Sequence, residues 1–225
     1  MVVVTGASRG LGNAIAERLR SNGVEVVGIA RSIEHLNYEC VQCDVSDYLS
    51  VKNAAKTVKK MGRQISAVVN AAGIASMNLA LMSDQNTTQN IIQTNLLGTI
   101  FCCQLFAPIM LRQNRGCFIN FSTIAVPLAL KGESIYVASK AGVEAFSRTF
   151  AREVADFNLR VNCISPGPIN TDLVEGLNAD QINKVSSQQI IQKQFMQSDV
   201  CDLVELLLDP KASSISGQVI HVGGV

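Results

Sequence analysis

A tyrosine and a lysine stand four residues apart, at Tyr136 and Lys140, in a stretch with helical apolar spacing. Positions i and i+4 share one face of a helix, so the phenol and the ammonium group can lie side by side. A cation beside a phenol lowers its pKa, which suits a general acid at neutral pH. Such pairs are common on surfaces, but here two hydroxyls, Ser122 and Thr123, end an apolar segment 13–14 residues earlier. Together these groups predict a site for proton transfer.

The chain opens with an apolar segment, Val2–Val4, that runs into a turn containing Gly6, Gly10 and Gly12. Helical spacing follows over Gly10–Ser21. This order of strand, turn and helix places backbone N–H groups and a helix N-terminus against a phosphate. The segment predicts the start of a nucleotide-binding βαβ unit, with an ordinary turn that happens to contain glycines as the alternative.

The residues after the second apolar segment bear on the kind of nucleotide. A dinucleotide fold often carries an acid here, about 20 residues past the glycines, that accepts from the ribose hydroxyls. This chain has Arg31 and Ser32 instead, and Arg9 lies in the glycine turn. Two cations and a hydroxyl favour a 2′-phosphate. Glu34 is close enough in sequence to pair with Arg31 and weaken that interpretation.

Further polar and small residues follow the next strand-like segments. Asp44 is well placed to accept from an adenine amino group, although an Asp at this position can also cap a helix, as Ser46 or Asp47 could. The small residues of Asn70–Gly73 let a cofactor approach the backbone. A stiff, turn-rich loop, Ser165–Thr171, follows a later strand.

Strand-like and helical segments alternate along the whole chain. The expected strands are Val2–Val4, Glu25–Ala30, Cys40–Cys43, Ile65–Val69, Cys117–Phe121, Leu159–Ile164 and Gln218–Val222. The expected helices are Gly10–Ser21, Val51–Met61, Asn86–Arg112, Ser134–Asp156, Asp180–Phe195 and Asp199–Leu208. Continuous Val/Ile strands between helices indicate an α/β fold: a doubly wound parallel Rossmann sheet of about seven strands, with helices on both faces and the ligand at the strands' carboxyl ends. A length of 225 residues suits a single domain, 1–225.

Composition and charge exclude several classes of protein. The net charge of +1 provides no bulk electrostatic reason for binding nucleic acid or an anionic membrane. We find no signal peptide and no apolar run of the ~18 residues that a membrane span needs. Seven cysteines without a spacing framework predict reduced thiols and a cytoplasmic protein. Cys40 and Cys43 lie in a strand pattern with no second pair to complete a zinc set, so no metal is expected.

Taken together, the motifs resemble the short-chain dehydrogenase/reductase family, and within it the 3-oxoacyl-ACP reductase-like NADPH ketoreductases. They arrive in the family's order and cover nearly the whole chain. The matching segments are Thr5–Gly12, Asp44–Val45, Asn70–Gly73, Asn95, Ser122–Thr123, Tyr136–Lys140 and Arg160–Gly167.

The resemblance implies an NADP(H)-dependent reduction of a ketone or 3-oxoacyl carbonyl to a hydroxyl. Tyr136 would donate a proton to the carbonyl oxygen, and Lys140 would hold the nicotinamide ribose and lower the pKa of Tyr136. A hydroxyl at the end of the fifth strand would polarise the carbonyl. Asn95, in a helix that the family kinks, would hold a water that joins Lys140 to bulk solvent.

The resemblance also implies a set of cofactor-binding residues, with Ile169 and Thr171 at the nicotinamide carboxamide. The full set is Gly6, Ser8, Arg9, Gly10, Leu11, Gly12, Arg31, Ser32, Asp44, Val45, Asn70, Ala71, Ala72, Gly73, Tyr136, Lys140, Pro166, Gly167, Ile169 and Thr171.

The departures from the family pattern leave choices open. The family has Ser-Ser at the end of the fifth strand, and by its count the catalytic hydroxyl is that of Thr123. Either Thr123 acts, which we favour, or Ser122 acts after a local shift. Arg112 and Arg115 precede that strand, but the basic residues that receive a carrier protein in some relatives are otherwise missing, so recognition of a carrier is open. An NAD-linked alcohol dehydrogenase and a non-catalytic NADPH-binding protein are the alternative functions.

Three expectations concern the surroundings of the site. The walls of the substrate pocket should come from Ile74–Asn78, Ala125–Ser134 and Thr171–Phe195, with Lys131 and Glu133 at the rim, which fits a medium-sized ketone. The helices Asn86–Arg112 and Ser134–Asp156 are too apolar for fully exposed faces. Because the family packs the equivalent helices between subunits, a homodimer or homotetramer is expected. The histidines, His35 and His221, lie outside the motifs and are expected to be structural or exposed.

Overall fold

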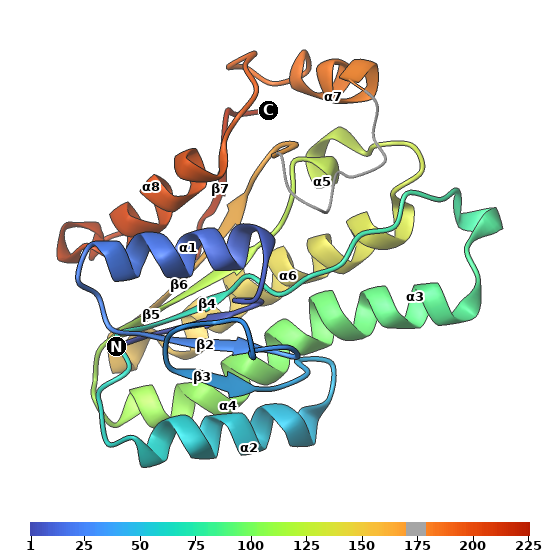
Figure 1. Cartoon of the computed structure of the whole chain (residues 1–225). Coiled ribbons are helices and arrows are strands. Elements are labelled where there is room, and N and C mark those ends of the chain that lie inside the picture. Colours follow the sequence, from blue (N-terminus) through green and yellow to red (C-terminus); the bar gives the residue numbers. More distant parts are fainter. Residues whose placement is uncertain (170–178) are drawn as a thin grey trace.

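Seven parallel strands form one sheet in the order β3-β2-β1-β4-β5-β6-β7 (Figure 1). The strands are β1 Val2–Thr5, β2 Val26–Ala30, β3 Cys40–Gln42, β4 Ala67–Asn70, β5 Gly116–Phe121, β6 Leu159–Ser165 and β7 Val219–His221. The computed structural model describes residues 1–169 and 179–225. The strand order reverses direction between β1 and β4, which is where such sheets bind ligands. The expected doubly wound α/β fold is therefore confirmed.

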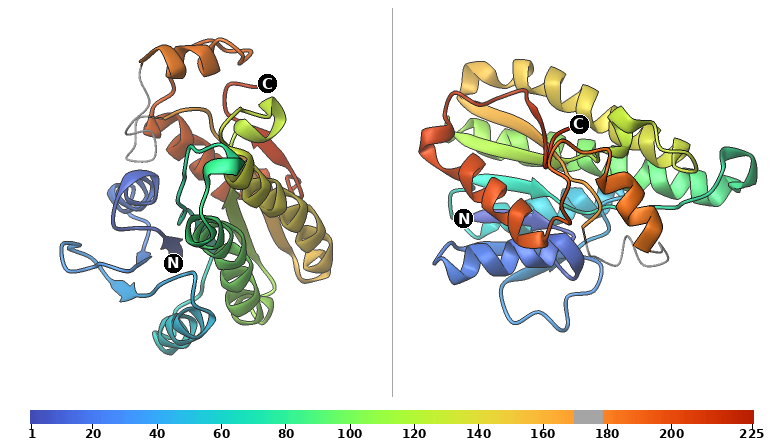
Figure 2. Two further views of the ribbon diagram at one scale, coloured as in Figure 1. Left: turned by 90° about the vertical axis from the view of Figure 1, so that its right-hand side faces the viewer. Right: turned by 90° about the horizontal axis from the view of Figure 1, so that it is seen from above.

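Helices cover both faces of the sheet, as the two turned views show (Figure 2). The main helices are α1 Gly10–Ser21, α2 Tyr48–Lys60, α3 Gln85–Ile91, α4 Gly98–Leu111, α5 Ala125–Leu128, α6 Ser134–Glu153, α7 Ala179–Ser186 and α8 Gln197–Leu208. One apolar layer joins Val2 and Val4 to α1 and α8, and the other joins Val3 to α2, α4 and α6. Successive side chains of β1 thus enter opposite layers, as the pleat of a strand requires.

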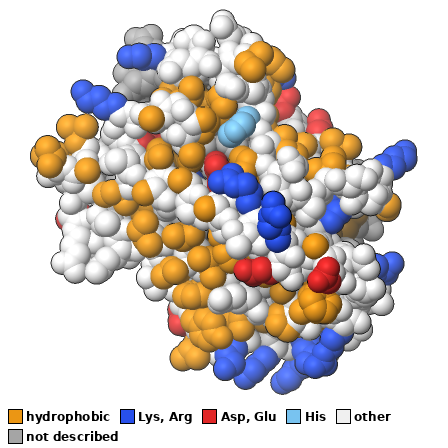
Figure 3. Space-filling view, turned by 180° about the vertical axis from the view of Figure 1, so that it is seen from behind, with side chains coloured by type: hydrophobic (Ala, Val, Ile, Leu, Met, Phe, Trp, Pro, Cys, Tyr) orange, Lys and Arg blue, Asp and Glu red, His pale blue; other side chains and the backbone are white. Residues whose placement is uncertain are grey.

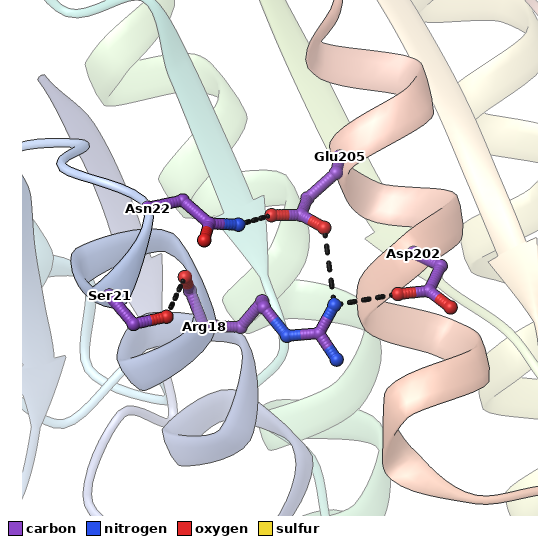
Figure 4. Close-up of polar contacts among 5 residues, drawn as sticks. All are labelled: Arg18, Ser21, Asn22, Asp202 and Glu205. Carbon is purple, nitrogen blue, oxygen red and sulfur yellow. Dashed lines mark hydrogen bonds and ion pairs between the residues drawn. The ribbon is translucent and has the colours of Figure 1, made fainter.

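A cluster of charged and polar side chains joins α1 to α8 (Figure 4). The Arg18 guanidinium lies 2.7 Å from Asp202 Oδ1 and 3.3 Å from Glu205 Oε2, and the Asn22 amide donates to Glu205. These side chains are partly exposed, so they add little stability. They fix the position of α1, which begins at the glycine turn, against its neighbour on the same face of the sheet.

The longest helical segment is continuous from Gln85 to Leu111 and passes through a π-helix, Ile92–Leu97. Its most apolar window has a mean hydropathy of 1.6, which by length and composition alone is enough for a membrane span. This differs from the expectation that no such segment exists. Within the fold, Cys102, Phe106 and Met110 of this helix are buried against the sheet, and this packing accounts for its apolar composition.

Several element boundaries differ from those expected. The helix α2 begins at Tyr48 because the Asp47 carboxylate caps it by accepting from the backbone N–H groups of Leu49 and Ser50. The expected helix Asp180–Phe195 ends at Ser186. Beyond it the backbone N–H of Ile191 donates to Gly223 O. These backbone contacts replace the helical hydrogen bonds that the sequence pattern predicted.

All seven cysteines are free thiols, and six of them are buried. Burial raises the pKa of Cys103 and of Cys163 to about 12, so both thiols stay protonated at neutral pH. In the part of the chain that the structure describes, no group of three or more His, Cys, Asp or Glu residues could hold a metal ion.

Candidate active site

A cleft of about 870 Å³ lies at the carboxyl ends of the central strands. The predicted site residues that line it are Gly6, Ser8, Arg9, Gly10, Leu11, Gly12, Arg31, Ser32, Asp44, Val45, Ala71, Ala72, Gly73, Ser122, Tyr136, Lys140 and Pro166. A smaller pocket of about 120 Å³ adjoins it and is lined by Thr123, Gly167 and Ile169 among others. Leu11, Ser122, Tyr136 and Pro166 are among the residues common to both linings. Thr171 lies outside the described residues.

The glycine turn is closely packed. Gly6 and Gly10 have φ angles of +69° and +57°, a region that glycine adopts readily and other residues rarely. A Cβ atom on Gly12 would lie 2.3 Å from Gly6 O, and one on Gly6 would lie 2.8 Å from Ala72 Cα. No side chain caps α1 at Arg9. The turn therefore brings bare backbone and a helix N-terminus to the cleft, which is the arrangement that binds a pyrophosphate.

Two arginines and a histidine surround the end of the cleft beyond the turn. Arg9 and Arg31 are exposed, and within the described residues no ion pair joins Arg31 to Glu34. His35 Nε2 lies 2.9 Å from Ser8 O, so this ring nitrogen carries the hydrogen, because a carbonyl oxygen only accepts. The sequence analysis did not assign His35 to the site. The sequence feature that could have indicated His35 is the short connection after Arg31, because the chain must pass over the glycine turn to reach β3.

Asp44 lines the cleft and is not the cap of α2. Its Oδ1 atom accepts from the backbone N–H and the hydroxyl of Ser46, at 2.9 and 2.7 Å. Asp47 takes the capping position. Of the three open alternatives for the cap, the structure thus selects Asp47 and leaves Asp44 at the cleft wall.

Lys140 is a largely buried side chain in the wall of the cleft. The side chain is only 5% exposed, and Nζ donates to Phe121 O at 2.9 Å. Nζ lies 5.9 Å from the centre of the Tyr136 ring. Burial lowers the pKa of Lys140 to about 8 because desolvation disfavours the ammonium form.

The pKa of Tyr136 shifts opposite to the expected direction. Burial is the largest cause of the rise in its pKa, and the nearby Glu133 carboxylate raises it further, while the neighbouring Thr123 hydroxyl opposes the shift. Lys140 is not among the causes in this structure. Desolvation of the phenolate is therefore the dominant cause of the shift in the pKa of Tyr136. The phenol keeps its proton throughout the neutral range.

The two candidate hydroxyls point to different partners. The Thr123 hydroxyl lies beside the Tyr136 phenol, and its Oγ1 atom accepts from Ala125 N at 3.2 Å. The Ser122 hydroxyl donates to Glu144 Oε1 at 2.6 Å, in the buried interior. Of the two, it is Thr123 that the structure places against the phenol, in the small pocket.

Asn95 and Asn70 lie behind the cleft and are not among the residues that line it. Asn95 is fully buried in the π-helix, where its side chain exchanges two hydrogen bonds with the backbone of Ile74, at 2.8 and 2.9 Å. Asn70 donates to Asn120 Oδ1 at 2.8 Å, and Asn120 donates to Ser147 Oγ. Both amides thus hold the loops and strands that form the cleft wall, whereas the sequence analysis placed Asn70 on the cofactor.

The wall of the small pocket agrees in part with the expected segments. Ala75, Ser76 and Met77 line it, as do Ala125, Leu130 and Glu133, with Val185 from α7. Lys131, expected at the rim, is not among its lining residues.

The lowered pKa of Lys140 predicts how the stability of the folded chain changes with pH. Below pH about 8 its ammonium is charged in both folded and unfolded chains, and burial costs the folded state about 3 kcal/mol at most. Between pH about 8 and about 10.5 the folded chain loses this proton first, so the cost disappears as pH rises. Urea unfolding should therefore give Lys140→Met a larger free energy of unfolding than the wild type below pH 8. The difference between the two proteins should shrink towards pH 10. An advantage that stays constant over this range would contradict the assignment.

Comparison with known proteins adds to this geometry. A family model described as enoyl-(acyl carrier protein) reductase matches residues 6–224. The 3-oxoacyl-[acyl-carrier-protein] reductase of Staphylococcus aureus (strain Mu50) is 35% identical over 236 residues, covering 99% of this chain and 96% of that protein. A Bos taurus 3-oxoacyl-[acyl-carrier-protein] reductase is 33% identical over 190 residues, which is 80% of each. The ligand-free aldohexose dehydrogenase of Thermoplasma acidophilum has a TM-score of 0.89 and 30% identity, covering 99% of this chain and 92% of that one.

Proposed function

Because the chain belongs to the short-chain dehydrogenase/reductase family, we propose that it is an NADP(H)-dependent oxidoreductase that reduces a ketone or 3-oxoacyl carbonyl to a hydroxyl. The observation that carries the proposal is the meeting of Thr123, Tyr136 and Lys140 where the cleft joins the small pocket. The relatives from Staphylococcus aureus and Bos taurus are reductases of 3-oxoacyl groups on acyl carrier protein, which supports this substrate chemistry.

The residues of the cleft fit an NADP(H) molecule. The glycine turn, in which α1 packs too closely on the backbone of Gly6 to admit a side chain at Gly12, presents bare backbone that is suited to the pyrophosphate. Arg9, Arg31 and Ser32 are suited to the phosphate on the adenosine ribose, and Asp44 to the adenine. When bound, the cofactor supplies the hydride.

The protein's own groups handle the proton and the developing charge. Tyr136, which is protonated at neutral pH, donates its phenolic proton to the carbonyl oxygen. The Thr123 hydroxyl donates a hydrogen bond to the same oxygen as negative charge develops there. Lys140 holds a positive charge behind Tyr136 and is anchored to the end of β5 through Phe121 O. Asn95 keeps the loop after β4 in place beside it.

An assay of NADPH consumption tests the proposal. The protein is mixed with NADPH and a panel of ketones, β-ketoacyl thioesters and quinones, and absorbance at 340 nm is followed. We expect turnover of at least one ketone or ketoacyl compound. Tight NADPH binding without turnover of any compound would instead favour the non-catalytic alternative, since a fold alone does not fix function.

The preference for NADPH over NADH provides a second test. Removing Arg31 with an Arg31→Ala substitution should weaken NADPH binding by about 10- to 100-fold, since a charge-assisted contact contributes roughly 1.5–3 kcal/mol. NADH, which lacks the phosphate, should bind as before. Dissociation constants follow from nucleotide fluorescence, with Lys56→Ala, an exposed lysine of α2, as the matched control. If NADH binds the wild type as tightly as NADPH, the NAD-linked alcohol dehydrogenase becomes the better description.

We also propose that the protein is a cytoplasmic homodimer or homotetramer. Apolar side chains of the long helices remain half-buried in the single chain, among them Leu97, Phe101, Leu105 and Phe146. Hydrophobic side chains also gather in patches on the back of the molecule (Figure 3). Val143 and Phe150 of α6 are buried in the chain's own core and belong to the face of the helix that covers the sheet. Light scattering at micromolar concentration is expected to give a multiple of 24.1 kDa, and a monomeric mass would refute this.

A further inference from the structure

A carboxylate stands at the N-terminus of α6 beside the proposed acid. Glu133 occupies the N-cap position of this helix, yet its side chain makes no capping hydrogen bond. It lines the small pocket together with Tyr136, which lies three residues further along the helix. Residues at this spacing are neighbours on one helix face, with Cβ atoms about 5–6 Å apart. The carboxylate is therefore within reach of a substrate whose carbonyl is held at Tyr136.

The rest of the pocket leaves this carboxylate uncompensated. Among the described lining residues Glu133 is the one charged side chain, and there is no lysine or arginine. Within the described part of the chain its carboxylate forms no hydrogen bond or ion pair. The group is half-buried, and burial raises its pKa. A partly desolvated acceptor without a partner costs free energy, so a ligand that donates to it gains by binding.

The chemistry of the pocket indicates what such a ligand carries. An ammonium group brings three N–H donors, which one carboxylate among apolar walls cannot satisfy. A hydroxyl brings a single donor, which Glu133 can accept, and its oxygen can in turn accept from a hydroxyl such as that of Ser76. A carboxylate on the ligand would be repelled by Glu133, because the described lining residues include no lysine or arginine that could neutralise the two negative charges.

Building on the proposed function, we propose that Glu133 determines substrate specificity by accepting a hydrogen bond from a hydroxyl near the reacting carbonyl. The substrates are then neutral hydroxylated carbonyl compounds, and simple alkyl ketones and oxo acids are poor substrates. Glu133 thus recognises the hydroxyl of the substrate and takes no part in proton or hydride transfer.

Three substrates of nearly equal size test this assignment with NADPH: 1-hydroxy-2-butanone, 3-pentanone and 2-oxobutanoate. They carry a hydroxymethyl group, an ethyl group and a carboxylate, respectively, beside the same ethyl ketone carbonyl. For the wild type, kcat/KM should be highest for the hydroxyketone, by about 10- to 100-fold over 3-pentanone, as for a hydrogen bond to a charged group. Glu133→Ala should remove this preference. Glu133→Gln keeps an acceptor oxygen, so it should keep much of the preference but lose the rejection of 2-oxobutanoate.

A binding measurement and a control complete the design. The complex of the protein with NADPH cannot oxidise an alcohol, so its affinity for 1,2-butanediol, followed by NADPH fluorescence, reports recognition without turnover. Glu133→Ala should weaken this affinity about tenfold or more. Lys131→Ala, a neighbouring charge outside the pocket lining, should leave all ratios unchanged within about twofold. If the wild type and the Glu133 variants turn over the three substrates in the same ratios, the role assigned to Glu133 is wrong and the proposed function still stands. If no carbonyl compound is turned over, both the role of Glu133 and the proposed function are wrong.

Discussion

Replacing Tyr136 with phenylalanine should lower kcat for carbonyl reduction by about 10³-fold, because a positioned general acid contributes roughly 10²–10⁴ in rate. The change removes one oxygen atom from a ring that lies between the cleft and the small pocket. The hydroxyl of Thr123 loses its polar neighbour, but the residues of the glycine turn are untouched. The dissociation constant of NADPH should therefore stay within a few-fold of the wild-type value. Steady-state kinetics and fluorescence titration measure the two quantities separately.

A second tyrosine serves as the control. Tyr48 is 42% exposed at the start of α2, where its ring packs edge-on against Phe101, and it is not among the residues that line the cleft. Tyr48→Phe should leave kcat unchanged. A Tyr136→Phe variant as fast as the wild type would show that another group donates the proton.

Removing the Thr123 hydroxyl has the second largest expected effect. Thr123→Ala should lower kcat by about 10²-fold, as the loss of one donor to a developing oxyanion commonly does. Thr123→Ser, which keeps the hydroxyl, should retain most of the activity. Pre-steady-state kinetics with a saturating ketone would show whether the loss falls on the chemical step.

The neighbouring serine gives the opposite pattern. Ser122→Ala should leave kcat nearly unchanged but destabilise the fold by about 1–3 kcal/mol, because Glu144 would lose the buried donor that now lies 2.6 Å away. Thermal unfolding and kinetics on the same sample distinguish the two effects. If Ser122→Ala lost the activity and Thr123→Ala kept it, the hydroxyl roles would have to be exchanged.

The sequence predicted those parts of the fold that depend on local pattern. Alternating strand and helix segments with short connections allow few topologies, and β1 through β7 form the expected parallel sheet. The position of Gly12 could also be interpreted in advance, because a tight turn between a strand and a helix has no room for a side chain where the helix packs on the backbone of the turn. Counting 13 residues back from Tyr136 pointed to Thr123, the hydroxyl that the structure places against the phenol.

Other features depend on contacts between distant segments. Asn70 ends β4 at the cleft edge, but its side chain turns inward because Asn120, on the neighbouring strand, offers a buried acceptor. His35 joins the cleft only because its loop crosses the turn at Ser8. The direction of the pKa shift of Tyr136 required knowledge of its burial, which is the largest cause of the shift. Sequence spacing alone contains none of this information.

The end of the chain has a role that its position in the sequence does not suggest. Gln189 is 2% exposed and donates to Val222 O at 2.8 Å. A Cβ atom on Gly167 would lie 2.6 Å from its Oε1 atom, and one on Gly223 would lie 2.4 Å from its Nε2 atom. The Gln189 side chain thus packs between Gly167, in the loop that lines the substrate pocket, and the turn at Gly223. A side chain introduced at Gly223 would displace Gln189 and so change the shape of the substrate pocket from a position outside its lining.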